Sequence, residues 1–334
     1  MDDTSAIRSS RTPFGVGSAV IVFAVLCVMA AAVATVWLGS WPYDIVSMTY
    51  PGDVSVALMA AVRAIALISG SVTVGAAAFA VFFVGHSGDG LLGGRGYAAT
   101  RLAARSAVVW AAASFAMIFA TSADGAGVSI GEMMDHDAFL DVYAAVEQPK
   151  SWTIAFVAAV AVAVTLRMAL RWVTVLATLG LSLPGVVAPG MVGNNGQGLD
   201  HDLATNAVIV HSAAAAVWLG VLVAAWSCLR SIDPGAVADE VLRRMRWFTV
   251  GAVLLLGGTG AGITWLQIHG GDLTSTYAVL ALGQAAATAL LALLALVRAR
   301  RPSKRGARRT GLLPDIILVL AAFAAAAIAA RIPS

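Results

Sequence analysis

Long apolar runs are the feature that most limits what this chain can fold into. Of its 334 residues, 60% are hydrophobic and 12% are charged, about half the charged share of a soluble domain. A bilayer core about 30 Å thick requires about 20 apolar residues per helix. Nine runs are candidate spans, at residues 16–38, 54–84, 101–122, 151–166, 172–192, 204–229, 247–268, 274–297 and 313–332, and the fourth of them is short. The sequence therefore predicts an all-α, polytopic integral membrane helix bundle with nine transmembrane helices.

The distribution of basic residues predicts the orientation of these spans. All but three of the 21 Lys and Arg residues fall in alternate loops, and the exceptions are Arg63, Lys150 and Arg331. Because Lys and Arg concentrate in cytoplasmic loops, we expect the N-terminus inside and the C-terminus outside. The opposite loops carry most of the acidic residues. We therefore expect a multi-pass protein of the bacterial plasma (inner) membrane with an acidic external face.

Two regions follow from this pattern. Residues 1–192 hold the first five spans and an external amphipathic loop, 123–150, in which we expect a short surface helix at residues 129–146. In the fifth span, Pro184 and Pro189 should kink or end the helix, since proline lacks the N–H that the helix needs. Residues 193–334 hold the remaining four spans.

The start of the second region is the richest in chemical groups. A loop rich in Gly and Asn, which includes Asn194, leads to Asp200, His201 and Asp202, and His211 lies two turns inside the following span. A charged side chain at the centre of a membrane helix costs roughly 2.5–3.5 kcal/mol, so ionisable groups in such helices are functional candidates. The structural alternatives are that His201 is a solvated residue at a helix start and that His211 bonds a neighbouring helix.

The external half also contains His269 and Met191, which makes it a candidate metal site. Imidazole binds copper, zinc, iron and nickel, and thioether sulfur favours copper(I). On one continuous helix, however, His201 and His211 are about 80° apart in rotation, so they meet only if the loop folds back over the helix start. Only neutral imidazole binds metal, so we expect binding to weaken below about pH 6.5.

Arg63 is the one basic residue well inside an apolar run. We expect its side chain either to extend to the interface or to pair with an acid such as Asp53, which would make it a supporting residue of the external mouth.

Other functional classes lack their motifs. The sequence has no Walker A motif, no GxSxG, no HExxH and no CxxCH, so we expect neither a hydrolase nor another enzyme. Cys27 and Cys228 stand far apart and form no metal-binding or redox motif. The basic residues are spread over several short loops, which does not favour nucleic-acid binding.

The second region resembles the CopD family, the inner-membrane copper resistance protein D. The resemblance covers residues 193–301 and rests on His211, Trp218-Leu219-Gly220, Arg243–Phe248, Gly262-Ile263-Thr264-Trp265, Leu273–Tyr277 and Arg298–Arg301. The first five spans, with Tyr50-Pro51-Gly52 before the helix that carries Arg63, resemble the N-terminal half of actinobacterial fusion proteins. Those proteins join a CopD-like half to a CtaG-like half that assembles cytochrome c oxidase. By this resemblance, the chain corresponds to the CopD-like half alone.

The resemblance implies a copper homeostasis protein that binds copper at the extracytoplasmic face and imports it. It points to His201 and His211 as ligands, with His269 as a further candidate and Asp200, Asp202, Asn194, Met191 and Arg63 as supporting residues. The partners implied are the copper ion, membrane lipid, and a periplasmic copper protein or the oxidase assembly machinery.

Two differences from the family motivate an alternative. The family tends to have a histidine near Asn194 and a lysine near Gln284, so the alternative is a non-catalytic membrane partner or assembly factor of a respiratory complex. A third hypothesis is a haem carrier with His211 as axial ligand. It requires a second histidine at similar depth, for which only His269 is a candidate.

Overall fold

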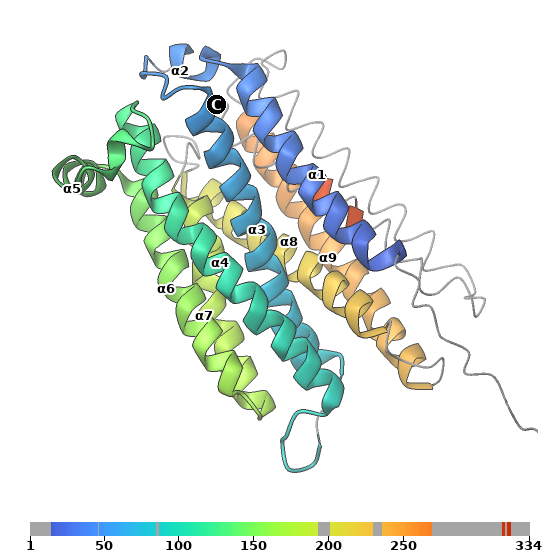
Figure 1. The fold of residues 1–334 in the computed structure, drawn as a ribbon. Coiled ribbons are helices and arrows are strands. Elements are labelled where there is room, and N and C mark those ends of the chain that lie inside the picture. Colours follow the sequence, from blue (N-terminus) through green and yellow to red (C-terminus); the bar gives the residue numbers. More distant parts are fainter. Residues whose placement is uncertain are drawn as a thin grey trace, which may run out of the picture.

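The structure is a computed structural model that describes residues 15–45, 47–84, 87–192, 201–229, 236–268, 316–317 and 319–321. The described residues form seven helices that are long and apolar enough to cross a membrane (Figure 1). They are α1 (Gly15–Leu38), α3 (Asp53–Phe82), α4 (Gly94–Ala126), α6 (Glu147–Met168), α7 (Trp172–Met191), α8 (His201–Leu229) and α9 (Ala236–Ile268). The predictions of an all-α fold and of a polytopic membrane protein are confirmed for this part of the chain.

These seven helices correspond to the first seven predicted spans. Two of them start well before the apolar run, α4 at Gly94 and α9 at Ala236, because a helix continues into the interface with charged residues that hydropathy does not count. Helix α7 continues through both Pro184 and Pro189 and ends at Met191, two residues after the second proline. The predicted eighth span lies outside the described residues, as does most of the ninth.

The external loop differs from its prediction of one helix at 129–146. It contains a 3₁₀ turn, η1 (Glu132–Met134), and a separate helix, α5 (His136–Ala145). The break falls at Asp135, whose backbone is extended and whose carboxylate accepts a hydrogen bond from the Ala138 N–H at 3.1 Å. An aspartate in this position caps a new helix and does not continue the old one. Figure 1 shows α5 beside the end of the bundle.

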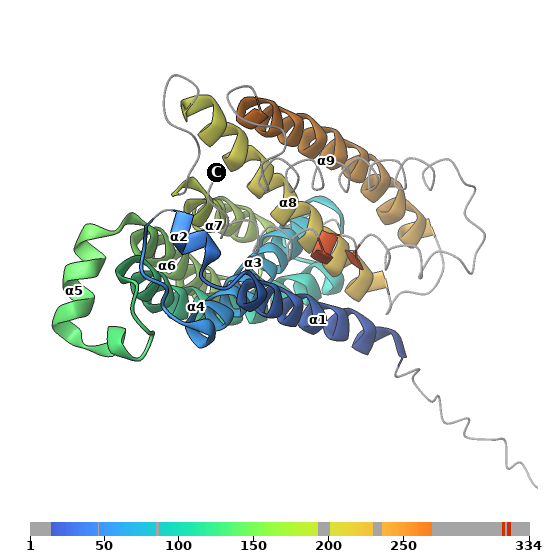
Figure 2. The same cartoon turned by 90° about the horizontal axis from the view of Figure 1, so that it is seen from above.

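Helix α3 is the central helix of the bundle. It packs against α1, α4, α7 and α8, while α4 packs on α6, α6 on α7 and α8 on α9 (Figures 1 and 2). One core contains Val74 and Phe79 of the first predicted region together with Trp218 and Leu222 of the second. The two predicted regions therefore share one apolar core where α3 meets α8.

The contact between α3 and α8 is a backbone contact at two glycines. A Cβ atom added to Gly220 would lie 1.9 Å from the carbonyl oxygen of Ser71, and one added to Gly75 would lie 2.3 Å from the backbone of Gly220. Small residues let membrane helices approach this closely, and the resulting van der Waals contact is a main source of their association. Only glycine fits at either position.

Alternate loops gather at the same end of the bundle. At one end, the Leu92 N–H donates to the Leu170 carbonyl at 2.9 Å, which joins the α3–α4 and α6–α7 loops. At the other end, the Gln148 amide donates to the Pro189 carbonyl at 3.2 Å. The first end carries Arg95, Arg101, Arg105, Arg167, Arg171, Arg243, Arg244 and Arg246, so basic residues that are distant in sequence meet at one end.

Candidate functional site

His211 is a half-buried imidazole between two membrane helices. It lies on α8 and faces α9, where its Nδ1 atom is 3.0 Å from the hydroxyl oxygen of Thr259. Gly260 leaves room for the ring, since a Cβ atom there would lie 3.5 Å from the imidazole Cε1 atom. Thr259 and Gly260 of α9 thus contact this ring, one as a polar partner and the other as a small residue that leaves space for it.

The hydrogen bonds around Thr259 favour one tautomer of His211. With the single hydroxyl hydrogen of Thr259 donated to the Leu255 carbonyl at 2.7 Å, the hydroxyl oxygen accepts from the imidazole. Nδ1 therefore carries the hydrogen, and the Leu256 carbonyl lies close to the ring as a further acceptor. The lone pair is left on Nε2. A histidine that ligates a metal has this arrangement, with one ring nitrogen held by a neighbour and the other left to bind.

The structure places His201, among the predicted ligands that it describes, away from His211. His201 begins the same continuous helix, and ten residues at 1.5 Å each place it about 15 Å away along the axis. A metal–imidazole bond is about 2.0–2.1 Å long, so one ion cannot bind both rings. Asp202 lies beside His201 in the first turn of α8, while Asp200, Asn194 and His269 lie outside the described residues.

Met191 is placed beside a different face of α8 from the one that carries His211. It is the exposed last residue of α7, next to Gly190, where an added Cβ atom would lie 3.6 Å from the Ser212 hydroxyl and 3.7 Å from Val208. By helical register, position 201 falls on the same side of α8 as Val208 and Ser212. The sequence candidates thus divide between the α7 side and the α9 side of α8.

His211 is one potential metal-binding donor among the residues that the structure describes. No group of three or more His, Cys, Asp or Glu residues that could hold a metal is found among them. The Nε2 lone pair of His211 suits a transition metal. A bound copper ion would therefore take His211 as one ligand and complete its coordination with groups from other parts of the chain, from solvent or from a partner.

A polar cluster at the acidic end of the bundle was not predicted from the sequence. The Tyr43 hydroxyl, from α2 (Trp41–Ile45), donates to the Asp124 carboxylate at 2.5 Å, and Arg63 interacts electrostatically with that carboxylate. The expected partner of Arg63, Asp53, instead accepts a hydrogen bond from Tyr50 at 2.5 Å. The predicted pair of Arg63 with Asp53 was wrong, because the acid that interacts with Arg63 is Asp124, near the end of α4 and not at the start of α3. Arg63 Nε is buried and lacks a hydrogen-bond acceptor among the described residues.

The aromatic residues before α3 connect this cluster to the surface. The rings of Tyr43 and Tyr50 pack edge to face with centroids 5.3 Å apart. Burial, together with the hydrogen bond to the negative Asp53, raises the pKa of Tyr50 to about 12. The only sequence signal for this arrangement was the Tyr50-Pro51-Gly52 segment, whose glycine has the positive φ of +92°.

Three uncharacterized mycobacterial proteins are similar to this chain. The uncharacterized proteins Mb0105 of Mycobacterium bovis and MT0111 of Mycobacterium tuberculosis are each 30% identical over 283 residues, or 83% of this chain and 41% of theirs. The uncharacterized protein ML1998 of Mycobacterium leprae is 30% identical over 160 residues, or 48% of this chain and 24% of its own. The chain thus spans less than half the length of these relatives. No protein-family model matches the sequence, and no solved structure gives a significant match.

The Trp218-Leu219-Gly220 segment has a structural role in the fold. Trp218 and Leu219 are buried, and Gly220 makes the backbone contact with α3. Trp218 Nε1 is buried without a hydrogen-bond acceptor among the described residues. This segment therefore holds α8 against α3 and fixes the face of α8 that carries His211.

Proposed function

We propose that this chain is a membrane protein that binds copper at His211 and carries it across the plasma membrane. The observation that carries the proposal is the pair of His211 and Thr259, which leaves the Nε2 lone pair of an intramembrane imidazole available. Copper is the metal implied by the CopD resemblance, and imidazole is a suitable ligand for it. The ion is the cargo, and no catalytic step is involved.

The proposed topology has nine spans with the N-terminus inside and the C-terminus outside. It is supported by the gathering of basic loops at one end of the seven described helices, since such loops stay on the cytoplasmic side. The acidic loops then face outward. An acidic mouth raises the local concentration of a cation, so copper meets His201 and Asp202 at the start of α8 before it reaches His211.

The separation of His201 from His211 makes these two stations successive. An ion that is held first near position 201 moves about 15 Å along α8 to the side that faces α9. Two single-imidazole stations bind more weakly than one site with several imidazoles, which suits release and onward transfer. The driving force is the gradient of the ion or the membrane potential, because the sequence offers no nucleotide-binding motif.

Uptake into proteoliposomes tests the proposal. The full chain would be reconstituted with a copper(I)-sensitive dye inside the vesicles, beside His211→Gln, with His136→Gln as a matched control on the exposed α5. We expect uptake by the wild type and the control and at least a tenfold lower rate for His211→Gln. Equal rates in all three would contradict transport through His211 and would favour the membrane-partner alternative.

A further inference from the structure

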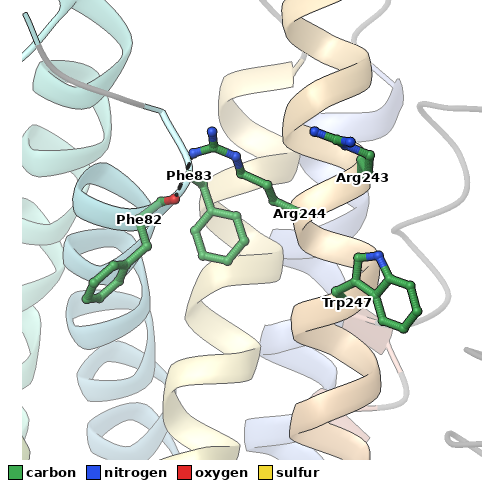
Figure 3. Close-up of a pocket in the computed structure, with 5 residues that line it drawn as sticks. All are labelled: Phe82, Phe83, Arg243, Arg244 and Trp247. Atoms are coloured by element: carbon green, nitrogen blue, oxygen red, sulfur yellow. Dashed lines mark hydrogen bonds between the residues drawn. The ribbon is translucent and has the colours of Figure 1, made fainter.

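A cleft of about 410 Å³ opens at the basic end of the bundle, between the end of α3 and the first turns of α9. It is lined by Phe82, Phe83, Arg243, Arg244 and Trp247 (Figure 3). The cleft lies toward the N-terminal end of α9, away from Thr259 and His211, and takes no part in the proposed copper path. Its lining combines two guanidinium groups with three aromatic rings, a mixture that matches an amphipathic ligand.

The charged wall of the cleft is pre-organised by one carboxylate. Glu240 accepts hydrogen bonds from Arg243 Nε at 2.9 Å and from Arg244 Nε at 2.8 Å. Arg244 also donates from Nη1 to the Phe82 carbonyl at 3.3 Å, at the end of α3 (Figure 3). One carboxylate thus orients two guanidinium groups and neutralises only one of their charges, so the wall retains a net positive charge that attracts an anion.

The apolar wall is partly fixed and partly open. Phe83 is buried, stacks on Phe79 with centroids 5.5 Å apart and meets Phe248 edge to face at 5.3 Å. Phe82 and Trp247, by contrast, are 55% and 72% exposed. Large aromatic side chains open at a helix end are typical of the membrane interface, where one side contacts acyl chains and the other contacts head groups.

The length of α9 places the cleft at that interface. The helix has 33 residues, or about 50 Å at 1.5 Å per residue, whereas the hydrocarbon core is about 30 Å thick. About 20 Å of the helix, or nearly four turns, must therefore extend beyond the core. With Ile268 at the far end, Arg243 and Arg244 fall in the head-group layer and Trp247 falls at its boundary with the acyl chains.

We infer that this cleft binds an anionic phospholipid, with the phosphate at Arg243 and Arg244 and the acyl chains against Phe82 and Trp247. Charge complementarity selects the anionic head group, and basic pockets between transmembrane helices bind such lipids. A lipid held here would bridge the α3 and α9 ends, because Arg244 already bonds the end of α3.

Native mass spectrometry of the purified full chain tests this inference. The protein would be released from mixed micelles that contain equal amounts of phosphatidylglycerol and phosphatidylcholine. The cleft variant Arg243→Gln/Arg244→Gln would be compared with Arg105→Gln/Arg167→Gln, which removes two exposed arginines of the same end outside the cleft. Arg243→Lys/Arg244→Lys keeps the charge and serves where the glutamine variant unfolds.

We expect the wild type and the control variant to retain phosphatidylglycerol over phosphatidylcholine. The cleft glutamine variant, which lacks two basic residues that contribute about 1 kcal/mol each, should bind it roughly 30-fold more weakly. The lysine variant should keep most of the preference. Inorganic phosphate at millimolar concentration should not displace the lipid. An equal loss in the control variant, no preference in the wild type, or displacement by phosphate would overturn the inference.

Discussion

The Nδ1 atom of His211 lies 3.0 Å from the Thr259 hydroxyl oxygen, and that hydroxyl donates in turn to the Leu255 carbonyl. The His211–Thr259 contact joins α8 to α9, and a Thr259 hydroxyl that donates to Leu255 favours the tautomer with the hydrogen on Nδ1. It makes Thr259 a positioning residue for any metal that His211 binds.

Thr259→Val should therefore weaken copper(I) binding without removing a ligand. Valine keeps the shape of threonine but offers no acceptor, so the imidazole loses the neighbour that sets its tautomer and orientation. Loss of such an outer partner reduces metal affinity by roughly 10–100-fold. Competition with a chromophoric copper(I) chelator measures the change, and Thr259→Ser, which keeps the hydroxyl, is the matched control. An unchanged affinity in the valine variant would show that the hydrogen bond is only structural.

Sequence reasoning recovered the helices better than the site. Runs of about 20 apolar residues are a local signal, and they located the seven described helices. The partner of Arg63 and the neighbour of His211 depend on which helices pack together. Asp124 and Thr259 lie 61 and 48 positions away in the chain, and no local pattern connects them. The start of a new helix after Asp135 could have been predicted from the sequence, because aspartate is a strong N-cap.

Gly220→Ala should destabilise the bundle strongly. The new methyl group would lie 1.9 Å from the Ser71 carbonyl oxygen, and backbone cannot move aside as a flexible side chain does. We expect a loss of at least the roughly 1–3 kcal/mol typical of an overpacked core, measured by thermal unfolding in detergent. Gly180→Ala on α7, where an added Cβ meets nothing within 4 Å, is the control and should be neutral. Comparable losses in both variants would mean that the close backbone contact between α3 and α8 does not make Gly220 more sensitive than Gly180.

Arg63 and Asp124 should be energetically coupled. Arg63 and Asp124 are half-buried and interact electrostatically, so removing either one leaves the other poorly compensated, and Arg63→Gln and Asp124→Asn should each cost roughly 1–3 kcal/mol. The double variant should cost clearly less than the sum of the two. Unfolding in detergent of all three variants measures the coupling, with Asp44→Asn, an exposed acid at the same end, as a control with little effect. Strict additivity would show that the two charges do not interact.

Tyr50 should titrate late at alkaline pH. Its pKa is raised from 10 to about 12 by burial and by Asp53, so the folded protein keeps this proton in a range where the unfolded chain loses it. The resulting stability is fully present below pH 10 and is lost as the pH rises through about 12. Absorbance at 295 nm, read as the difference between wild type and Tyr50→Phe, follows this group. In Asp53→Asn the transition should move down toward 10, and an unmoved transition would exclude Asp53 as a cause.

Copper content per protein molecule tests the central claim most directly. The wild type, His211→Gln and His136→Gln would be loaded with copper(I), freed of excess metal and measured by mass spectrometry of the element. We expect equal copper in the wild type and in His136→Gln, and clearly less in His211→Gln, because only the station near His201 then remains. Equal copper in all three proteins, whether high or at trace level, would contradict a copper site at His211.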